Sequence, residues 1–447
     1  MLAMQNGVAV RRELLERLTG ARRRSDALFS LVRADSLYER PIPERHRIIF
    51  YVGHLEAFDW NLLHEIFGAQ SLHPEFDRLF AFGIDPVGGG LPGDQPSDWP
   101  SLDAVHSYVT KIRAALDEKL ANGALESAQT RGGFPVDALL NVALEHRLMH
   151  VETLAYMLHQ LSLDKKVRQK DPRNLDAGPV IHRMVDIPAG VATLGLRRDS
   201  ETFGWDNEYE SQIVDVPAFV IDRFKVTNRQ YLEFVAGGGY DTRRFWSDDD
   251  WNWRTARGIT HPVFWKKTGD RCTGEDWVYR TMFGELPLPL DWPVYVSQAE
   301  ANAYARWAGK SLPTEPEWHR AAYGAAGESE RTYPWGSNAP DPDFGNFDFQ
   351  SWDPTPVSAF PRGRSAFGVD DMLGNGWEWT STLFAPFSGF EPFPFYRGYS
   401  ADFFDGKHFV MKGGSARTAT CMLRPTFRNW FQAHYQYVYA GFRCVSR

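Results

Sequence analysis

Hydrophobic residues follow a helical period through the first third of the chain. The longest such run, residues 137–163, contains no glycine or proline, so we predict one continuous helix there. Three earlier stretches carry the same signal, at residues 9–34, 45–67 and 101–122, and Ser101 is a suitable N-cap for the last of these. Four long antiparallel helices joined by loops predict a bundle, an architecture that can hold a metal ion between facing helices.

The hydrophobic pattern changes near residue 165. Residues 165–182 are charged and rich in turn formers, and they are predicted to be a linker. Beyond them Gly, Pro, Trp, Asp and Asn recur every few residues, apolar runs are short, and helical patterns remain only at 297–309 and 315–323. No fixed internal period is found, which argues against a repeat array. We therefore predict a helical bundle at 1–164 and a loop-rich α+β domain at 183–447.

Composition and charge narrow the function classes. A chain of 447 residues, 43% of them hydrophobic, can form two or three domains with real cores. The net charge is −8 and the basic residues are dispersed, which argues against a nucleic-acid-binding surface. The three cysteines cannot form a disulfide framework and fit a reducing compartment. No secretory leader or membrane-spanning run is found, so we predict a soluble cytoplasmic protein.

Two histidines lie one turn apart on the predicted 137–163 helix. His146 and His150 are at i and i+4, so their imidazoles share one face and can bind the same metal ion. The alternative is that they are simply neighbours on a helix. A metal site requires a third ligand from another part of the fold.

The second domain carries a series of short motifs in a distinctive order. They are IPAG (187–190), FGWDNE (203–208), VTN (226–228), GGGY (237–240), LPTE (312–315), YPWG (333–336), DMLGN (371–375), WEW (377–379), GGS (413–415) and GFR (441–443). Together they resemble the formylglycine-generating-enzyme, or sulfatase-modifying-factor, fold, which is C-type-lectin-like. The cysteine chemistry of those enzymes needs two cysteines shortly after the GGS motif, and it is not expected here, because only Cys421 follows the motif closely and stands at the wrong spacing, while Cys444 is expected to be a buried structural thiol.

A helical bundle placed ahead of such a domain resembles the ergothioneine-biosynthesis sulfoxide synthases. In that family a DinB-like bundle supplies three histidines to a non-haem Fe(II), and the resemblance covers the whole chain. It implies that His54 is the third ligand beside His146 and His150. Three neutral imidazoles suit Fe(II) or Zn²⁺ and leave positions open for exogenous ligands. The resemblance selects iron, with O2 as co-substrate, and structural calcium is considered for the loops near 341–348.

The same resemblance implies substrate-binding residues in the second domain. The sequence Arg-Asn-Trp-Phe at 428–431 matches a stretch that lines the pocket for hercynine, Nα-trimethylhistidine. Asn429 is expected to hydrogen-bond the substrate and Trp430 to face its quaternary ammonium, although core packing is the alternative for Trp430. Tyr396 and Tyr399 are expected near the iron, where one of them would donate a proton. The full set of predicted substrate residues is Met149, Arg428, Asn429, Trp430 and Phe431.

Departures from the sulfoxide synthase pattern concern the second substrate. Met149 stands where the family's iron helix has a glutamine that contacts hercynine, and residues 79–99 lack arginines for the carboxylates of a dipeptide. Residues 88–99 instead offer types that bind sugars, unless this is an ordinary surface loop: Asp94, Gln95, Asp98 and Trp99. This pattern resembles the selenoneine synthase branch, which joins hercynine to a 1-seleno-sugar.

The leading hypothesis is therefore Fe(II)- and O2-dependent formation of a C–Se bond between hercynine and a selenosugar, in selenoneine biosynthesis. One alternative is an ergothioneine-type sulfoxide synthase that forms a C–S bond between hercynine and cysteine or γ-glutamylcysteine. An alternative of another class is a non-catalytic binding protein. All partners expected are small molecules, with no nucleic acid and no membrane.

Overall fold

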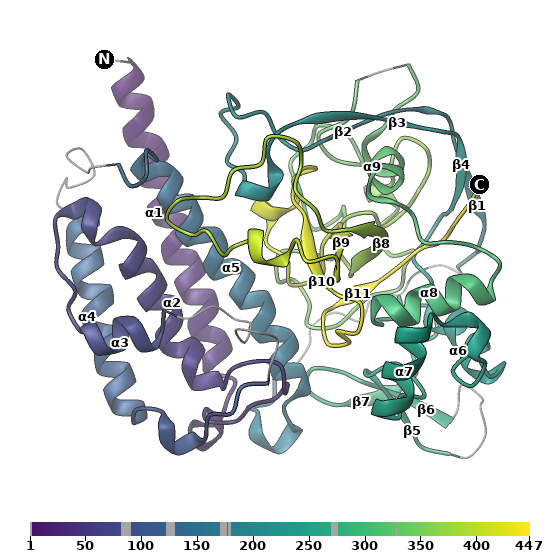
Figure 1. Cartoon of the computed structure of the whole chain (residues 1–447), viewed down its shortest axis with the longest axis horizontal. Helices are drawn as coiled ribbons and strands as arrows, with labels where there is room; N and C mark the ends of the chain where they lie inside the picture. Colours follow the sequence, from purple (N-terminus) through teal and green to yellow (C-terminus); the bar gives the residue numbers. More distant parts are fainter. Residues whose placement is uncertain are drawn as a thin grey trace. The chain divides into compact units, whose positions relative to one another are not determined.

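The chain forms two compact units, one helical and one rich in strands and loops (Figure 1). The computed structural model describes residues 2–81, 91–121, 130–169, 177, 180–269, 276–327 and 329–447, with side chains from residue 11 onward. The first unit comprises residues 1–169 and 393–395, and the second comprises 170–392 and 396–447. The predicted fold class is confirmed.

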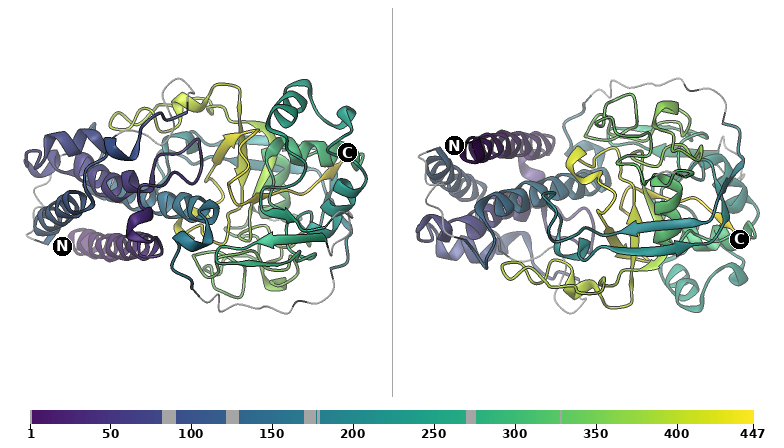
Figure 2. Two further views of the ribbon diagram at one scale, coloured as in Figure 1. Left: turned by 90° about the horizontal axis from the view of Figure 1, so that it is seen from below. Right: turned by 90° about the horizontal axis from the view of Figure 1, so that it is seen from above.

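Four long helices make up the first unit, and they lie side by side in Figures 1 and 2. Its helices are α1 (Leu2–Phe29), α2 (Ile48–Leu63), the short α3 (Pro74–Leu79), α4 (Leu102–Ala121) and α5 (Val136–Gln160). Helix α1 packs against α5, and α2 packs against both α4 and α5. Almost every side chain of α2 and α5 is buried, charged ones included, so these two helices form the core of the unit.

Several predicted boundaries and elements need correction. Helix α2 begins three residues later than expected, because Arg47 has an extended backbone, and α1 ends at Phe29 instead of residue 34. The short α3 was not predicted. The predicted linker lies partly outside the described residues. At its start Lys166 is buried and bridges to Val32, so this part of the chain packs on the helical unit.

The second unit contains four small sheets and four helices among its described residues. The sheets, in spatial order, are β1 (Met184–Ile187), β4 (Phe219–Asp222) and β12 (Val445–Ser446); β2 (Gly190–Leu194) and β3 (Gln212–Val216); β5 (Trp265–Lys267), β6 (Trp277–Arg280) and β7 (Glu285–Pro287); and β10 (Asn429–Gln432), β9 (His408–Lys412), β8 (Trp377–Leu383) and β11 (Ala440–Gly441). The helices are α6 (Asn228–Ala236), α7 (Asp248–Arg257), α8 (Gln298–Trp307) and α9 (Glu315–Tyr323).

Helix α9 lies at the core of the second unit. It packs against β2, β3, β8 and β9, and Trp318 on it is fully buried in a hydrophobic cluster of the second unit. All pairings in the sheet that carries β10 are antiparallel except that of β11 with β8. Trp430 is opposite Val410 in this sheet, so β9 holds the strand on which the predicted substrate residues stand.

Two helices of the second unit, α6 and α7, were not predicted. Each begins at a side-chain cap: Thr227 accepts a hydrogen bond from the Gln230 amide, and Ser247 accepts one from the Asp250 amide. Short helices of this kind depend on capping and on tertiary packing more than on a long apolar period. Across the described part of the chain, no helix combines the length and apolar character needed to cross a bilayer.

Candidate functional site

The structure brings His54, His146 and His150 together between α2 and α5. The Nε2 atom of His150 lies 3.2 Å from that of His54 and 3.1 Å from that of His146. One nitrogen from each ring can be chosen so that all three lie within 4.8 Å of one another, and each side chain is at most 2% exposed. The helical i, i+4 spacing places two of the rings, and the packing of α2 on α5 adds the third.

Neighbouring aromatic rings and one carbonyl hold the imidazoles in place. His54 Nδ1 is 2.6 Å from the Phe80 carbonyl oxygen, to which it donates, so its Nε2 keeps a lone pair directed at the other histidines. The His54 ring stacks on Phe50, and the His146 ring stacks on Phe58 at a centroid distance of 3.4 Å. Gly53 allows this arrangement, because a Cβ there would lie 2.6 Å from the Phe80 ring.

Burial keeps the three imidazoles neutral. It lowers the pKa of His54 to about 4, with help from the charges of His46 and Arg147 and against the hydrogen bond to Phe80. Burial and the neighbouring histidines also lower the pKa of His146 and of His150 well below the usual value. A neutral imidazole is the form that binds a metal ion.

Two of the three nitrogen–nitrogen separations fit a single metal ion. Two nitrogens that are each about 2.1 Å from one ion, at angles between octahedral and tetrahedral, lie about 3.0–3.4 Å apart. The observed Nε2 separations of 3.1 and 3.2 Å fall inside this interval. Three neutral nitrogens suit Fe(II), Zn²⁺ or a related divalent ion and leave coordination positions for other ligands.

These lowered pKa values predict metal binding that depends little on pH. Three histidines with an ordinary pKa would lose about 70-fold in affinity between pH 8 and pH 6, because protons would compete with the metal. We expect a change of less than about threefold, measurable by Zn²⁺ competition with a chelator at pH 6, 7 and 8. A loss near 70-fold would contradict the burial argument.

The same shifts fix the direction of the stability change in the metal-free protein. Between pH 6.5 and about 4 the unfolded chain binds protons on histidines that the folded chain leaves neutral. The free energy of unfolding therefore falls as the pH drops through this window.

Met149 occupies a distinct position on α5. It directly precedes His150. It is partly exposed, whereas residues 142–148 and His150 are all buried. Its side chain is thus the accessible one on the turn that carries two of the three histidines.

The predicted substrate residue Trp430 and the predicted proton donors Tyr396 and Tyr399 meet in an aromatic group in the second unit. The Trp430 ring stacks on Phe384 at 4.2 Å and meets the ring of Tyr399 edge-on at 5.4 Å. Tyr399 in turn stacks on Trp205 and lies 5.5 Å from Tyr396. Trp430 and Tyr396 are half-buried, whereas Tyr399 is buried.

Asn429 and Phe431 flank Trp430 on β10. The Asn429 side-chain oxygen accepts a hydrogen bond from the Trp430 amide, 2.8 Å away. The Phe431 ring stacks on Tyr435 at 4.8 Å. Because successive side chains of a strand point to opposite faces, Phe431 and Trp430 do not line the same side of β10.

Arg428 was predicted to bind substrate, and the structure gives it a different environment. It is 2% exposed, its guanidinium donates to Glu315 at 3.1 Å and to the Ala385 carbonyl at 3.0 Å, and it lies over the Phe384 ring. Arg428 and Trp430 therefore contact the same phenylalanine. Arg428 supports the aromatic group and its charge is paired with Glu315, and its contact with a substrate stays a prediction.

Glu315 is the carboxylate that compensates this buried charge. Its side chain is 2% exposed and lies 3.8 Å from the ammonium of Lys412 as well as beside Arg428. Burial lowers the pKa of Lys412 to about 8 even with Glu315 nearby. Removal of the carboxylate would leave two buried cations without a close counter-ion.

Glu315→Gln is therefore predicted to destabilise the protein by about 3–5 kcal/mol, as expected when one partner of a buried ion pair is lost. Chemical denaturation measures the change. Glu285→Gln is the control, because Glu285 pairs with Lys266 at the surface, where the two side chains are 39% and 60% exposed, and about 1 kcal/mol or less is expected there. Equal losses in the two variants would show that Glu315 is no more important than a surface residue.

In the loop predicted to hold a sugar, the side chain of Asp94 is paired with other residues of the protein. Residues 88–90 lie outside the described part of the chain. Asp94 accepts hydrogen bonds from Arg47 at 3.0 Å and from the Trp99 indole at 2.8 Å, and it also pairs with Arg40. The carboxylate of Asp94 thus ties the loop to the helical unit and is not free for a ligand.

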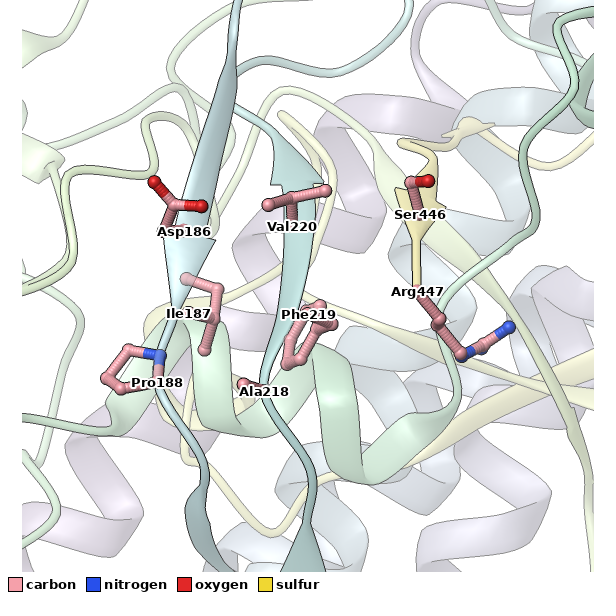
Figure 3. A pocket seen from close by; sticks show the side chains of 8 residues that line it. All are labelled: Asp186, Ile187, Pro188, Ala218, Phe219, Val220, Ser446 and Arg447. Atoms are coloured by element: carbon pink, nitrogen blue, oxygen red, sulfur yellow. The ribbon is translucent and has the colours of Figure 1, made fainter.

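A separate hollow of about 390 Å³ lies beside the β1–β4–β12 sheet (Figure 3). It is lined by Asp186, Ile187, Pro188, Ala218, Phe219, Val220, Ser446 and Arg447. None of the predicted site residues is among them.

Sequence reasoning missed the residues that support the histidines. Phe80 and Phe58 stand among other apolar residues, and neither their residue type nor their spacing marks them as neighbours of the histidines. Arg147, Glu56 and Asp59 do carry one, since charged residues inside two apolar helices must be paired.

Known proteins resemble both units. The DinB superfamily model matches residues 17–154, and the sulfatase-modifying factor enzyme 1-like domain model matches residues 171–447. The hercynine oxygenase of Mycolicibacterium smegmatis is 36% identical over 83% of this chain and 83% of its own length. The hercynine oxygenase of Mycobacterium tuberculosis is 43% identical over 56% of this chain and 57% of its own. Ergothioneine biosynthesis protein 1 of Neurospora crassa is 29% identical over 92% of this chain and 55% of its own.

A DinB-type helical domain with a buried three-histidine cluster, followed by a sulfatase-modifying-factor domain, defines a two-domain class of protein. The chain belongs to the ergothioneine-biosynthesis sulfoxide synthase family, as predicted. The names of these relatives support the prediction of an oxygen-dependent oxidoreductase. The chain spans little more than half the length of the M. tuberculosis and N. crassa relatives.

Proposed function

We propose that the protein is a non-haem iron enzyme that uses O2 to join hercynine to a thiol. The observation that carries the proposal is the buried set of three neutral imidazoles, His54, His146 and His150, in a chain whose relatives are named hercynine oxygenases. In the balanced reaction the imidazole C–H and the thiol S–H are lost and a C–S(O) bond forms. One atom of O2 enters the sulfoxide and the other leaves as water.

The histidines have three tasks in this reaction. They would hold the metal as neutral donors, their burial keeps bulk water from the protein side of the site, and they would leave coordination positions for other ligands. Bound Fe(II) would supply the redox chemistry with O2 that zinc lacks. Phe80 fixes the tautomer of His54 through its carbonyl, so the Nε2 atom stays a donor to the metal.

The aromatic group is the proposed hercynine site. A quaternary ammonium cannot form hydrogen bonds, and it is recognised by ring faces, of which Trp430 offers the most favourable kind. Asn429 uses its oxygen on the Trp430 amide, and as the neighbour of Trp430 on β10 it points to the other face of the strand, so its contact with the substrate stays a prediction. Tyr396 is half-buried and is the better placed of the two tyrosines to donate a proton to a substrate, since Tyr399 is buried against Trp205.

The sulfur donor is favoured over the selenium donor. The sequence pattern placed a selenosugar first, but the names of the relatives refer to hercynine and to ergothioneine biosynthesis. The internal pairing of Asp94 removes part of the case for a sugar-binding loop. Cysteine and γ-glutamylcysteine are therefore the donors we propose.

A competition assay tests the donor. Purified protein with Fe(II), O2 and hercynine is offered cysteine, γ-glutamylcysteine and 1-selenoglucose together, and the products are identified by mass. Sulfoxides of hercynine are expected. Coupling to the selenosugar alone would restore the selenium hypothesis, and binding of hercynine without any turnover would favour the non-catalytic alternative.

A further inference from the structure

A buried network of charged residues lies directly beside the three histidines. Arg147 follows His146 on α5, and Glu56 and Asp59 follow His54 on α2. The Arg147 guanidinium donates to Glu56 at 2.9 Å and to Asp59 at 2.6 Å, and all three side chains are at most 1% exposed. A third hydrogen bond of 3.0 Å runs from Arg147 to the carbonyl of Leu55, the residue after His54.

The network reaches all four long helices of the first unit. Arg113 on α4 donates to Glu56 at 2.7 Å and to Asp26 on α1 at 2.7 Å. Arg147 also lies 3.3 Å from the hydroxyl of Ser25 on α1. Among the described residues, Asp59 Oδ1 has no hydrogen-bond partner, so Arg147 is the main compensation for that carboxylate.

Stability alone does not account for such a network. Burial of ions costs free energy that their attraction only partly offsets, and well-packed apolar residues of similar volume often stabilise a fold as well or better. An arginine guanidinium adds a fixed orientation between the helices, because its planar, fork-shaped set of N–H donors matches carboxylates and a carbonyl in one orientation only. The aliphatic contacts between α2 and α5 have no comparable directionality.

The register of α5 against α2 is what the three histidines require. The spacing of His146 and His150 is set within α5 itself, but the 3.2 Å between His54 and His150 crosses from one helix to the other. A slip by one residue would move the helices by about 1.5 Å along their axes. Such a shift would carry this separation outside the interval that one ion can bridge.

We infer that Arg147, held by Glu56 and Asp59, is a positioning residue that fixes α5 against α2 and thereby sets the His54–His150 separation for metal binding. The inference rests on the proposed function, because it concerns the metal ligands. It assigns a metal-organising role to three residues that contact neither the metal nor a substrate.

Arg147→Lys tests the inference, because lysine keeps the positive charge and removes the fork. Arg113→Lys is the matched control, since Arg113 belongs to the same network but donates to α1 and α2 only. Co²⁺ is the probe: its affinity is measured by chelator competition and its coordination by the EPR spectrum of the bound ion. Thermal unfolding of each metal-free variant is recorded in parallel.

We expect Arg147→Lys to bind Co²⁺ about 10–100-fold more weakly, with an altered EPR spectrum, while Arg113→Lys stays within about twofold of wild type. Wild-type affinity and spectrum in a folded Arg147→Lys protein would overturn the inference and leave Arg147 a purely structural residue. If Arg147→Lys does not fold, Asp59→Asn is judged by the same two measurements. Failure of the wild-type protein to bind Co²⁺ would instead refute the proposed function, and the inference with it.

Discussion

His150→Ala is expected to lose metal binding almost completely. The His150 Nε2 atom lies within 3.2 Å of the Nε2 atoms of both other histidines. Its removal leaves only His54 and His146 as donors to the metal. Structural sites of four ligands provide about 10–16 kcal/mol, or about 3 kcal/mol for each ligand, which corresponds to a loss of about 100-fold or more in affinity. Metal analysis after loading with Fe(II) under anaerobic conditions measures the outcome.

His64→Ala is the matched control for this variant. His64 directly follows α2, its ring stacks on Trp60, and its Nδ1 donates to the Ala69 carbonyl at 3.0 Å. We expect the control to keep full metal content, because His64 is tied to local contacts. Unchanged iron in His150→Ala, or equal losses in the two variants, would show that the buried histidines do not form the metal site.

Trp430→Leu is expected to raise the KM for hercynine about tenfold, with a smaller effect on kcat. A cation–π contact contributes about 0.5–2 kcal/mol, and leucine offers no ring face to a quaternary ammonium. Trp430→Phe keeps a ring and is expected to change KM about two- to threefold. Steady-state kinetics at saturating thiol measure these values.

Trp335→Leu controls for the loss of an indole in the same unit. Trp335 is half-buried, as Trp430 is, and its ring stacks on Tyr333 at 5.2 Å and on Phe344 at 4.7 Å, neither of which belongs to β10. Its replacement is expected to leave KM for hercynine unchanged. A Trp430→Leu enzyme with wild-type KM would remove this residue from the substrate site and make it a packing residue.

The helical unit could be predicted from the sequence because its signal is local. Helix α5 shows its apolar period over 25 residues, and the i, i+4 spacing of His146 and His150 is a property of that helix alone. His54 was different, since no local pattern separates a ligand from a structural histidine, and it entered through the resemblance to a family. Its contact with His150 spans 96 residues of sequence.

The roles of Arg428 and Arg147 could not be predicted, because they depend on contacts between residues far apart in the sequence. The contact of Arg428 with Glu315 spans 113 residues, so a sequence pattern that shows a polar neighbour of Trp430 does not show that its charge is already paired. Arg147 and Asp59 are separated by 88 residues, and each alone resembles an ordinary charge on a helix. Long-range pairing of charges decides these roles, and a single sequence does not reveal it.

The most direct test of the central claim is oxygen uptake by the protein loaded with one Fe(II) per chain. With ¹⁸O2, hercynine and γ-glutamylcysteine or cysteine, we predict that one O2 is consumed for each coupled product and that the product sulfoxide carries one ¹⁸O atom. Iron-loaded protein that consumes no oxygen in response to hercynine, or that oxidises the thiol without forming a C–S bond, would contradict the proposed function.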